Sequence, residues 1–188
     1  MYKQMLLGLL LVGGLSFLQA QEISPSRKQA IDSLALEKVR DLSRYISIIG
    51  DKSTPFSEGN RVIDRAVELF AEGSLIGVSS LYKEEIQEFE VRRYFERLMA
   101  LNYEKVSIKW FNIQYISDLE QQPDGRFVGI ITIFQRFEGV TKEGLKYQDT
   151  TKKDITIYVE RKQTQIGGRL INFWDVLLGD IRVKETSA

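Results

Sequence analysis

Two residue types are missing from this chain of 188 residues, which contains no histidine and no cysteine. Without cysteine the chain has no disulfide framework, so its folded core must supply the stability. Without either residue, metal sites built from thiolates or imidazoles are excluded. Catalysis by a histidine as general acid or base is excluded for the same reason.

The chain also has no excess of charge, with 26 basic and 26 acidic residues. No net field would therefore attract nucleic acid or an anionic membrane. Basic runs interleaved with aromatic residues are absent as well, and nucleic acid is not an expected partner. The composition, 43% hydrophobic and 28% charged, is that of a globular chain with core for one domain.

Metal and cofactor motifs are similarly scarce. The remaining acidic clusters, Glu84-Glu85 and Glu88 to Glu90, lack the spacing and the glycine turn of a calcium loop. The pair Gly167-Gly168 precedes a strand pattern and opens no helix, so it indicates a turn and no phosphate loop. Neither a metal nor a cofactor is predicted.

The first 20 residues have the pattern of a signal peptide. Lys3 gives a positive start, residues 5–18 are mainly apolar, and Ala20 stands at the expected cleavage position. An uncleaved anchor is the alternative. We expect an exported bacterial protein, periplasmic or secreted, with no stable membrane insertion after cleavage. A linker over 21–27 and a single domain over 28–185 would follow.

Three helices are predicted in the first half of the domain. The first covers 28–49, because Ala35, Val39, Leu42, Ile46 and Ile49 repeat with helical spacing. The second covers 57–71 and the third covers 91–99. Strand signals over 75–78 and 86–89 indicate a hairpin between the second and third helices.

Four long strands are predicted in the second half. They cover 106–115, with a bulge near Trp110, then 126–140, 147–163 and a last strand after Gly168. Turns with glycine separate the later strands. Helices first and then a run of strands joined by short turns predict an α+β fold with a strongly curved, mainly antiparallel mixed sheet.

This order of elements resembles the cone-shaped fold of the nuclear transport factor 2-like (NTF2-like) superfamily, which includes ketosteroid isomerase and SnoaL-like proteins. The resemblance covers about Leu34 to Val183. It is carried by the hairpin that runs into the helix 91–99 and by the closing strand, Gly168-Arg169-Leu170-Ile171-Asn172-Phe173-Trp174-Asp175. Stretches such as Gln135-Arg136-Phe137 are also similar to exported members from anaerobic bacteria. The resemblance implies a concave sheet with a cavity.

Carboxylates and tyrosines are the candidate catalytic groups. An isomerase or lyase of the ketosteroid isomerase type needs a carboxylate base and donors for the developing oxyanion. Asp175, Asp149 and Tyr147 are weak candidates, and no catalytic residue is assigned. Asp175 shares its strand phase with Ile171 and Phe173, which predicts an apolar environment. A structural tie to an arginine or a backbone amide explains this acid better than catalysis does.

Five residues are candidates for binding a ligand in the cone: Trp110, Arg136, Trp174, Tyr94 and Tyr115. Arg136 could grip a ligand carboxylate through two parallel hydrogen bonds, but an outward-facing ion pair is the stronger alternative. For the two tryptophans, a place in the core is the stronger alternative to a platform for a planar ligand.

The sequence thus predicts a non-catalytic binding module. It would hold a small apolar or carboxylate-bearing ligand in the cone, or dock a partner protein on its sheet. The alternatives are an isomerase or lyase of the ketosteroid isomerase type and a structural component of an envelope assembly. A homodimer through the sheet is a further expectation. A deep, closed pocket with Asp149 or Asp175 buried within hydrogen-bonding reach of a tyrosine would favour the enzyme. A cone filled by Trp110, Phe134 and Trp174 would remove both ligand hypotheses and leave the interaction module.

Overall fold

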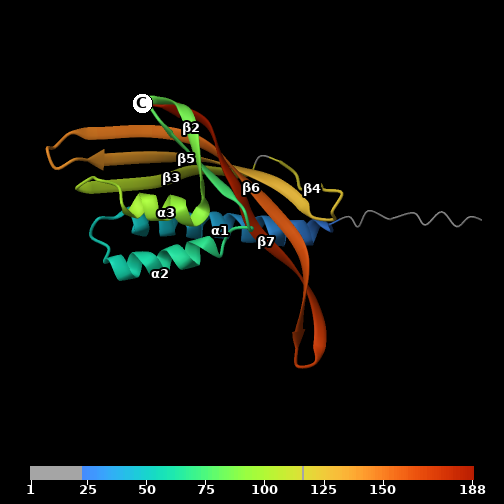
Figure 1. Ribbon diagram of the computed structural model, residues 1–188. Helices are drawn as coiled ribbons and strands as arrows, with labels where there is room; N and C mark the ends of the chain where they lie inside the picture. The colour runs from blue at the N-terminus through green and yellow to red at the C-terminus, as the bar shows by residue number, and fades with distance from the viewer. Residues whose placement is uncertain (1–22, 116) are drawn as a thin grey trace, which may run out of the picture.

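A computed structural model describes residues 23–115 and 117–188 as three helices packed on one side of a seven-stranded sheet (Figure 1). The elements in chain order are α1 (Pro25–Gly50), α2 (Phe56–Val67), β1 (Leu75–Ser80), β2 (Lys83–Glu90), α3 (Val91–Met99), β3 (Lys105–Tyr115), β4 (Glu120–Gln121), β5 (Phe127–Val140), β6 (Lys146–Ile166) and β7 (Arg169–Ser187).

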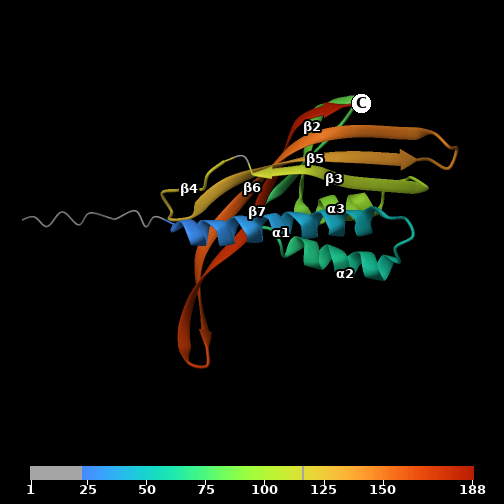
Figure 2. The same cartoon turned by 180° about the vertical axis from the view of Figure 1, so that it is seen from behind.

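The sheet is mixed, with the strand order β2-β1-β7-β6-β5-β3 and with β4 attached to β5. Every neighbouring pair is antiparallel except β1 and β7, which run parallel where Ile76 faces Ile181. The sheet curves over the helices in both views (Figures 1 and 2). The predicted fold class, an α+β fold with three helices on a strongly curved mixed sheet, is confirmed.

The helices form where the apolar spacing predicts them. In α1 the five stripe residues are all buried, from Ala35 to Ile49. The helix begins at Pro25, ahead of the predicted start at 28, because proline suits the first turn of a helix. Conversely, α2 ends at Val67 and not at 71, and Phe70 leaves the helix to form a bridge with Leu178 of β7.

The predicted bulge in β3 lies slightly later than Trp110. The pairing with β5 shifts register between Phe111 and Gln114. Asn112 occupies the left-handed region there, with φ of 49°. Asparagine tolerates this conformation better than most residues, which explains why the extra residue falls there.

The two longest strands, β6 and β7, divide into a covered part and a free part. Ile155, Ile157 and Val159 of β6 are fully buried under the helices and β5. Beyond Val159 the hairpin leaves the body and extends away from the helices (Figure 1). We call residues 160–175 the β-arm; Gly167 and Gly168, with φ of 56° and 79°, form its tip. In the described ranges no helix is long and apolar enough to cross a membrane.

Candidate functional site

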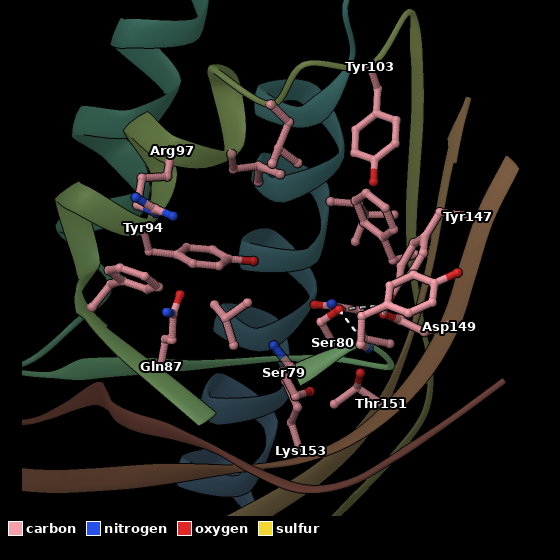
Figure 3. A pocket seen from close by; sticks show the side chains of 18 residues that line it. Ser79, Ser80, Gln87, Tyr94, Arg97, Tyr103, Tyr147, Asp149, Thr151 and Lys153 are labelled. Carbon is pink, nitrogen blue, oxygen red and sulfur yellow. Dashed lines mark hydrogen bonds between the residues drawn. The ribbon is translucent and has the colours of Figure 1, made fainter. Parts of the chain in front are cut away.

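A cavity of about 310 Å³ lies between α3, the β1–β2 hairpin and the inner face of the sheet. Figure 3 shows its walls, with Tyr94 and Arg97 of α3 on one side and Tyr147 and Asp149 of β6 on the other. Six of its lining residues are aromatic: Tyr82, Phe89, Tyr94, Tyr103, Phe137 and Tyr147. The cone is therefore hollow. Trp110, Phe134 and Trp174, the residues that could have filled it, are not among the residues that line the cavity.

The polar part of the cavity comes from one face of one strand. Tyr147, Asp149, Thr151 and Lys153 are spaced by two along β6, so their side chains point to the same side. The same face continues into the core from Ile155 onward. A single strand thus carries a polar segment into the cavity and an apolar segment into the core.

Asp149 is held by Tyr147. The Tyr147 hydroxyl donates to Asp149 Oδ2 at 2.6 Å and accepts from the backbone N–H of Leu81 at 3.1 Å. Only 5% of the Asp149 surface is exposed. Burial raises the pKa of Asp149, while the hydrogen bond from Tyr147 and the positive charge of Lys153 oppose that rise. Burial likewise raises the pKa of Tyr147, and its bond to Asp149 adds to this shift.

Lys153 is the most unusual residue of the site, because an ammonium group is rarely buried. It is 3% exposed, and its Nζ donates to the carbonyl oxygen of Gly77 at 3.1 Å. Burial lowers the pKa of Lys153 to about 8, against the opposing effect of the Asp149 carboxylate. The amine is therefore protonated in most molecules at neutral pH.

The cavity wall carries more positive than negative charge. Among the lining residues whose side chains the structure describes, Arg97 and Lys153 are basic and Asp149 is acidic, which gives a formal excess of one positive charge. The Arg97 guanidinium lies over the ring of Phe89, 4.5 Å from the ring centre. This contact places the guanidinium beside an aromatic wall.

Three of the sequence-predicted residues meet in this cavity, namely Tyr94, Tyr147 and Asp149. Tyr94 is buried on α3, its ring packs edge-on against Phe95, and burial raises the pKa of its hydroxyl. Tyr94 on α3 and Tyr147 on β6 are 53 positions apart in the sequence, and the curvature of the sheet brings them together.

Asp175 lies elsewhere, and the prediction that its side chain points into an apolar layer was wrong. Along β7 the phase of Trp174, Val176 and Leu178 faces the core, which turns Asp175 outward. Its carboxylate pairs with Lys162 Nζ at 2.6 Å in the β-arm. Asp175 therefore belongs to a cross-strand ion pair outside the cavity.

The remaining ligand-binding candidates also lie outside the cavity lining. Arg136 is exposed on the outer face of β5, with its guanidinium 5.7 Å from the centre of the Phe111 ring. Trp110 donates from its indole to Gln135 Oε1 at 3.1 Å, and Trp174 packs edge-on against Phe127. The side chain of Tyr115 lies outside the described residues.

The polar lining residues that were not predicted from the sequence include Lys153, Gln135 and Arg97. The sequence did contain a signal for Lys153. It is spaced by two residues from Ile155, so the alternation that places Ile155 and Ile157 on one face of the strand also includes Lys153. Gln135 precedes the predicted candidate Arg136, and its side chain lies on the opposite face of the strand. Nothing in the sequence separates Arg97 from the other charged residues of α3.

No family model matches the sequence, and no curated protein matches it. Three solved structures are similar in fold. A protein provisionally named scytalone dehydratase from Novosphingobium aromaticivorans is 11% identical, with a TM-score of 0.45, over 86% of this chain and 90% of that one. A type 2 hexachlorocyclohexane dehydrochlorinase (LinA) is 13% identical, with a TM-score of 0.43, over 85% and 91%.

The third is a protein provisionally named as a calcium/calmodulin-dependent protein kinase II association domain, from Xanthomonas campestris. It is 13% identical, with a TM-score of 0.36, over 85% of this chain and 86% of that one. At these identities and TM-scores, no activity passes from these proteins to this chain.

Proposed function

We propose that the cavity binds a small, mainly apolar molecule whose anionic group, such as a carboxylate, is received by Lys153. The observation that carries this proposal is a buried ammonium group in the wall of a mainly apolar cavity. A charge in such a place is costly unless something compensates it. A bound anion would supply the compensation that Asp149, the opposing charge in the lining, supplies in part.

The size and lining of the cavity set the class of ligand. A volume of about 310 Å³ lies at the lower end of the range for small-molecule pockets. The six aromatic side chains offer ring faces and edges to an apolar or aromatic body. The excess positive charge of Arg97 and Lys153 over Asp149 favours a ligand with one negative charge.

Calorimetric titration with two probes of the same shape tests the proposal. Phenylacetate carries a carboxylate, and 2-phenylethanol carries a hydroxyl in its place. We expect phenylacetate to bind more tightly, and the Lys153→Met variant to lose at least about tenfold of that affinity. Lys152→Met is the matched control, since Lys152 is the preceding residue on the same strand and is not part of the cavity lining. Equal binding of both probes, or an unchanged affinity of Lys153→Met, would reject the role of Lys153.

A second candidate function is proton transfer at a carbon next to a carbonyl group. The observation in its favour is the buried Asp149 within hydrogen-bonding distance of Tyr147. In this reaction the Asp149 carboxylate would take the proton, and the Lys153 ammonium would stabilise the enolate oxygen. This is the isomerase or lyase alternative with Asp149 in place of Asp175.

Hydrogen–deuterium exchange of a ketone distinguishes this function from binding alone. The protein would be incubated in D₂O with phenylacetone, and exchange of the protons next to the carbonyl followed by NMR. An enzyme of this class would accelerate the exchange, and Asp149→Asn would abolish the acceleration. If the wild type gives no acceleration while phenylacetate binds, the cavity is a binding site without this activity.

A further inference from the structure

The outer edge of β7 is unoccupied along the β-arm. On this edge β7 forms a bridge with Phe70 at Leu178 and pairs with β1 at Ile181. Within residues 23–115 and 117–188, no backbone partner of the edge lies between Arg169 and Asp175. Both cartoons show the arm extending clear of the helices (Figures 1 and 2). An exposed strand edge of this kind is a template for pairing with another strand.

The arm's turn determines which backbone groups face that edge. Only Gly167 and Gly168 separate the strands, so Ile166 and Arg169 form the hydrogen-bonded pair that closes the hairpin. Backbone groups of an antiparallel strand point alternately to its two neighbours. The N–H and C=O groups of Leu170, Asn172 and Trp174 therefore point away from β6.

The sequence of this edge complements itself when two copies run antiparallel. With Asn172 of one copy opposite Asn172 of the other, three kinds of pair form. They are Arg169 with Asp175, Leu170 with Trp174, and Ile171 with Phe173. One register therefore combines a pair of opposite charges, two apolar pairs and a symmetric pair of amide side chains.

We propose that this edge of the β-arm binds the same edge of a second copy of the chain, around a two-fold axis at Asn172. The outward backbone groups of Leu170, Asn172 and Trp174 then meet those of the partner copy, which gives about six hydrogen bonds. The contact is isologous, so it closes as a dimer and leaves no open end on β7.

The length of the free edge fits this register. Gly168 at the tip of one arm falls opposite Val176 of the other copy, two residues before Leu178, where the edge is already occupied. The side chain of Arg169 is exposed. Asp175 accepts from Lys162 through Oδ2, which leaves Oδ1 for the partner's arginine.

The apolar residues of the arm support the same pairing. Ile171 and Phe173 are 43% and 42% exposed in the single chain. The register places Ile171 of one copy against Phe173 of the other, so both would be covered. The β6 edge lacks this complementarity. Centred on Gln163, it would place Glu160 opposite Ile166. The β7 edge is therefore the one that pairs.

Sedimentation velocity of the purified protein with two matched proline variants tests the interface. Asn172→Pro removes an outward N–H at the proposed axis, whereas Gln163→Pro does so on the β6 edge, at the residue paired with Asn172 across the hairpin. We expect a wild-type dimer, an unchanged dimer for Gln163→Pro, and at least about tenfold weaker dimerisation for Asn172→Pro. A wild-type monomer at about 100 µM, or equal behaviour of the two variants, would overturn the proposal.

Cross-linking gives a second readout that does not depend on the effect of proline on folding. Since the chain has no cysteine, Asn172→Cys introduces a single thiol. Paired residues of this kind lie about 5.5 Å apart between Cα atoms, so a short bismaleimide should join two copies. Gln163→Cys is the control and should remain uncross-linked. Cross-linking of both variants, or of neither, would contradict an interface centred on Asn172.

Discussion

The strands β6 and β7 are buried along one half of their length and exposed along the other. Over the helices, the inner face of β6 is buried from Asp149 to Val159. Tyr147, Asp149, Thr151 and Lys153 on this face line the cavity. In the β-arm, Ile166, Leu170 and Phe173 are all exposed by 42% or more. Both halves contain apolar residues at strand spacing. Burial therefore depends on what covers the strand, and the helices and β5 cover only the first half.

The acidic residues of the two halves also lie in different environments. Asp149 is enclosed with a tyrosine and a lysine, and its environment shifts its pKa upward. Asp175 forms an ion pair with the partly exposed Lys162 at the surface. Surface ion pairs contribute little to stability, whereas buried polar networks are costly to break. Substitutions in the buried half should therefore change the free energy of unfolding more than substitutions in the β-arm.

The largest difference should come from apolar truncation. Ile157→Ala removes a fully buried side chain and should lower the free energy of unfolding by about 2–5 kcal/mol. Ile166→Ala, at the end of the same strand and 61% exposed, should change it by less than about 0.5 kcal/mol in the monomer. Urea denaturation of both variants measures the difference. Similar losses at both positions would mean that the arm is covered in solution.

The buried charge of Lys153 gives the next effect, and its sign depends on pH. The pKa of about 8 in the folded chain lies below the ordinary 10.5, so the unfolded chain binds more protons between these values. Stability contributed by this group therefore rises with pH above about 8 and is lost as the pH falls through 8.

Lys153→Met removes this dependence. We expect the free energy of unfolding of the variant, relative to that of the wild type, to fall by about 1–3 kcal/mol between pH 7 and about 9.5, because only the wild type gains stability over this range. Urea denaturation across this range measures it, with Lys152→Met as the control. A constant difference between pH 7 and about 9.5 would show that Lys153 titrates normally.

Loss of the tyrosine hydroxyl should have a smaller cost. Tyr147→Phe leaves the buried Asp149 without its 2.6 Å donor and should lower the free energy of unfolding by about 1–2 kcal/mol. Tyr82→Phe is a matched control, since Tyr82 also lines the cavity but is 84% exposed. If both variants lose the same stability, the bond to Asp149 does not stabilise the fold.

The smallest effect is expected for the acid of the β-arm. Asp175→Asn breaks the pair with Lys162 and should cost less than about 1 kcal/mol in a monomeric sample. The cost should fall further in high salt, because exposed charges are screened. A loss comparable to that of Tyr147→Phe would place Asp175 in a more enclosed environment than the surface of the arm.

The fold was predictable because its local signals agree with its global arrangement. The apolar stripe of α1 and the turn at Gly125 each favour the element that forms. The exact ends were less predictable, since Phe70 is drawn out of α2 by a bridge to a strand more than one hundred residues later. Such a contact has no local signal.

The candidate site was only half predictable. Tyr147 and Asp149 could be named because an isomerase or lyase of the ketosteroid isomerase type needs a carboxylate base and a hydroxyl donor. Lys153 was overlooked because a lysine in a strand is usually solvated. Asp175 was placed wrongly because the apolar residues on its own phase, Ile171 and Phe173, lie in the β-arm and are left uncovered by the fold. Period-two spacing predicts that residues share a face, but not which face will be buried.

The titration of the Lys153 side chain tests the central claim most directly. The lysine Nζ resonances of ¹⁵N-labelled protein can be followed by NMR against pH, with the Lys153→Met spectrum identifying the signal. We predict a pKa near 8 in the free protein, and an increase when phenylacetate is added, because a bound carboxylate favours the charged amine. A pKa close to the ordinary value of 10.5 that does not respond to phenylacetate would contradict the account.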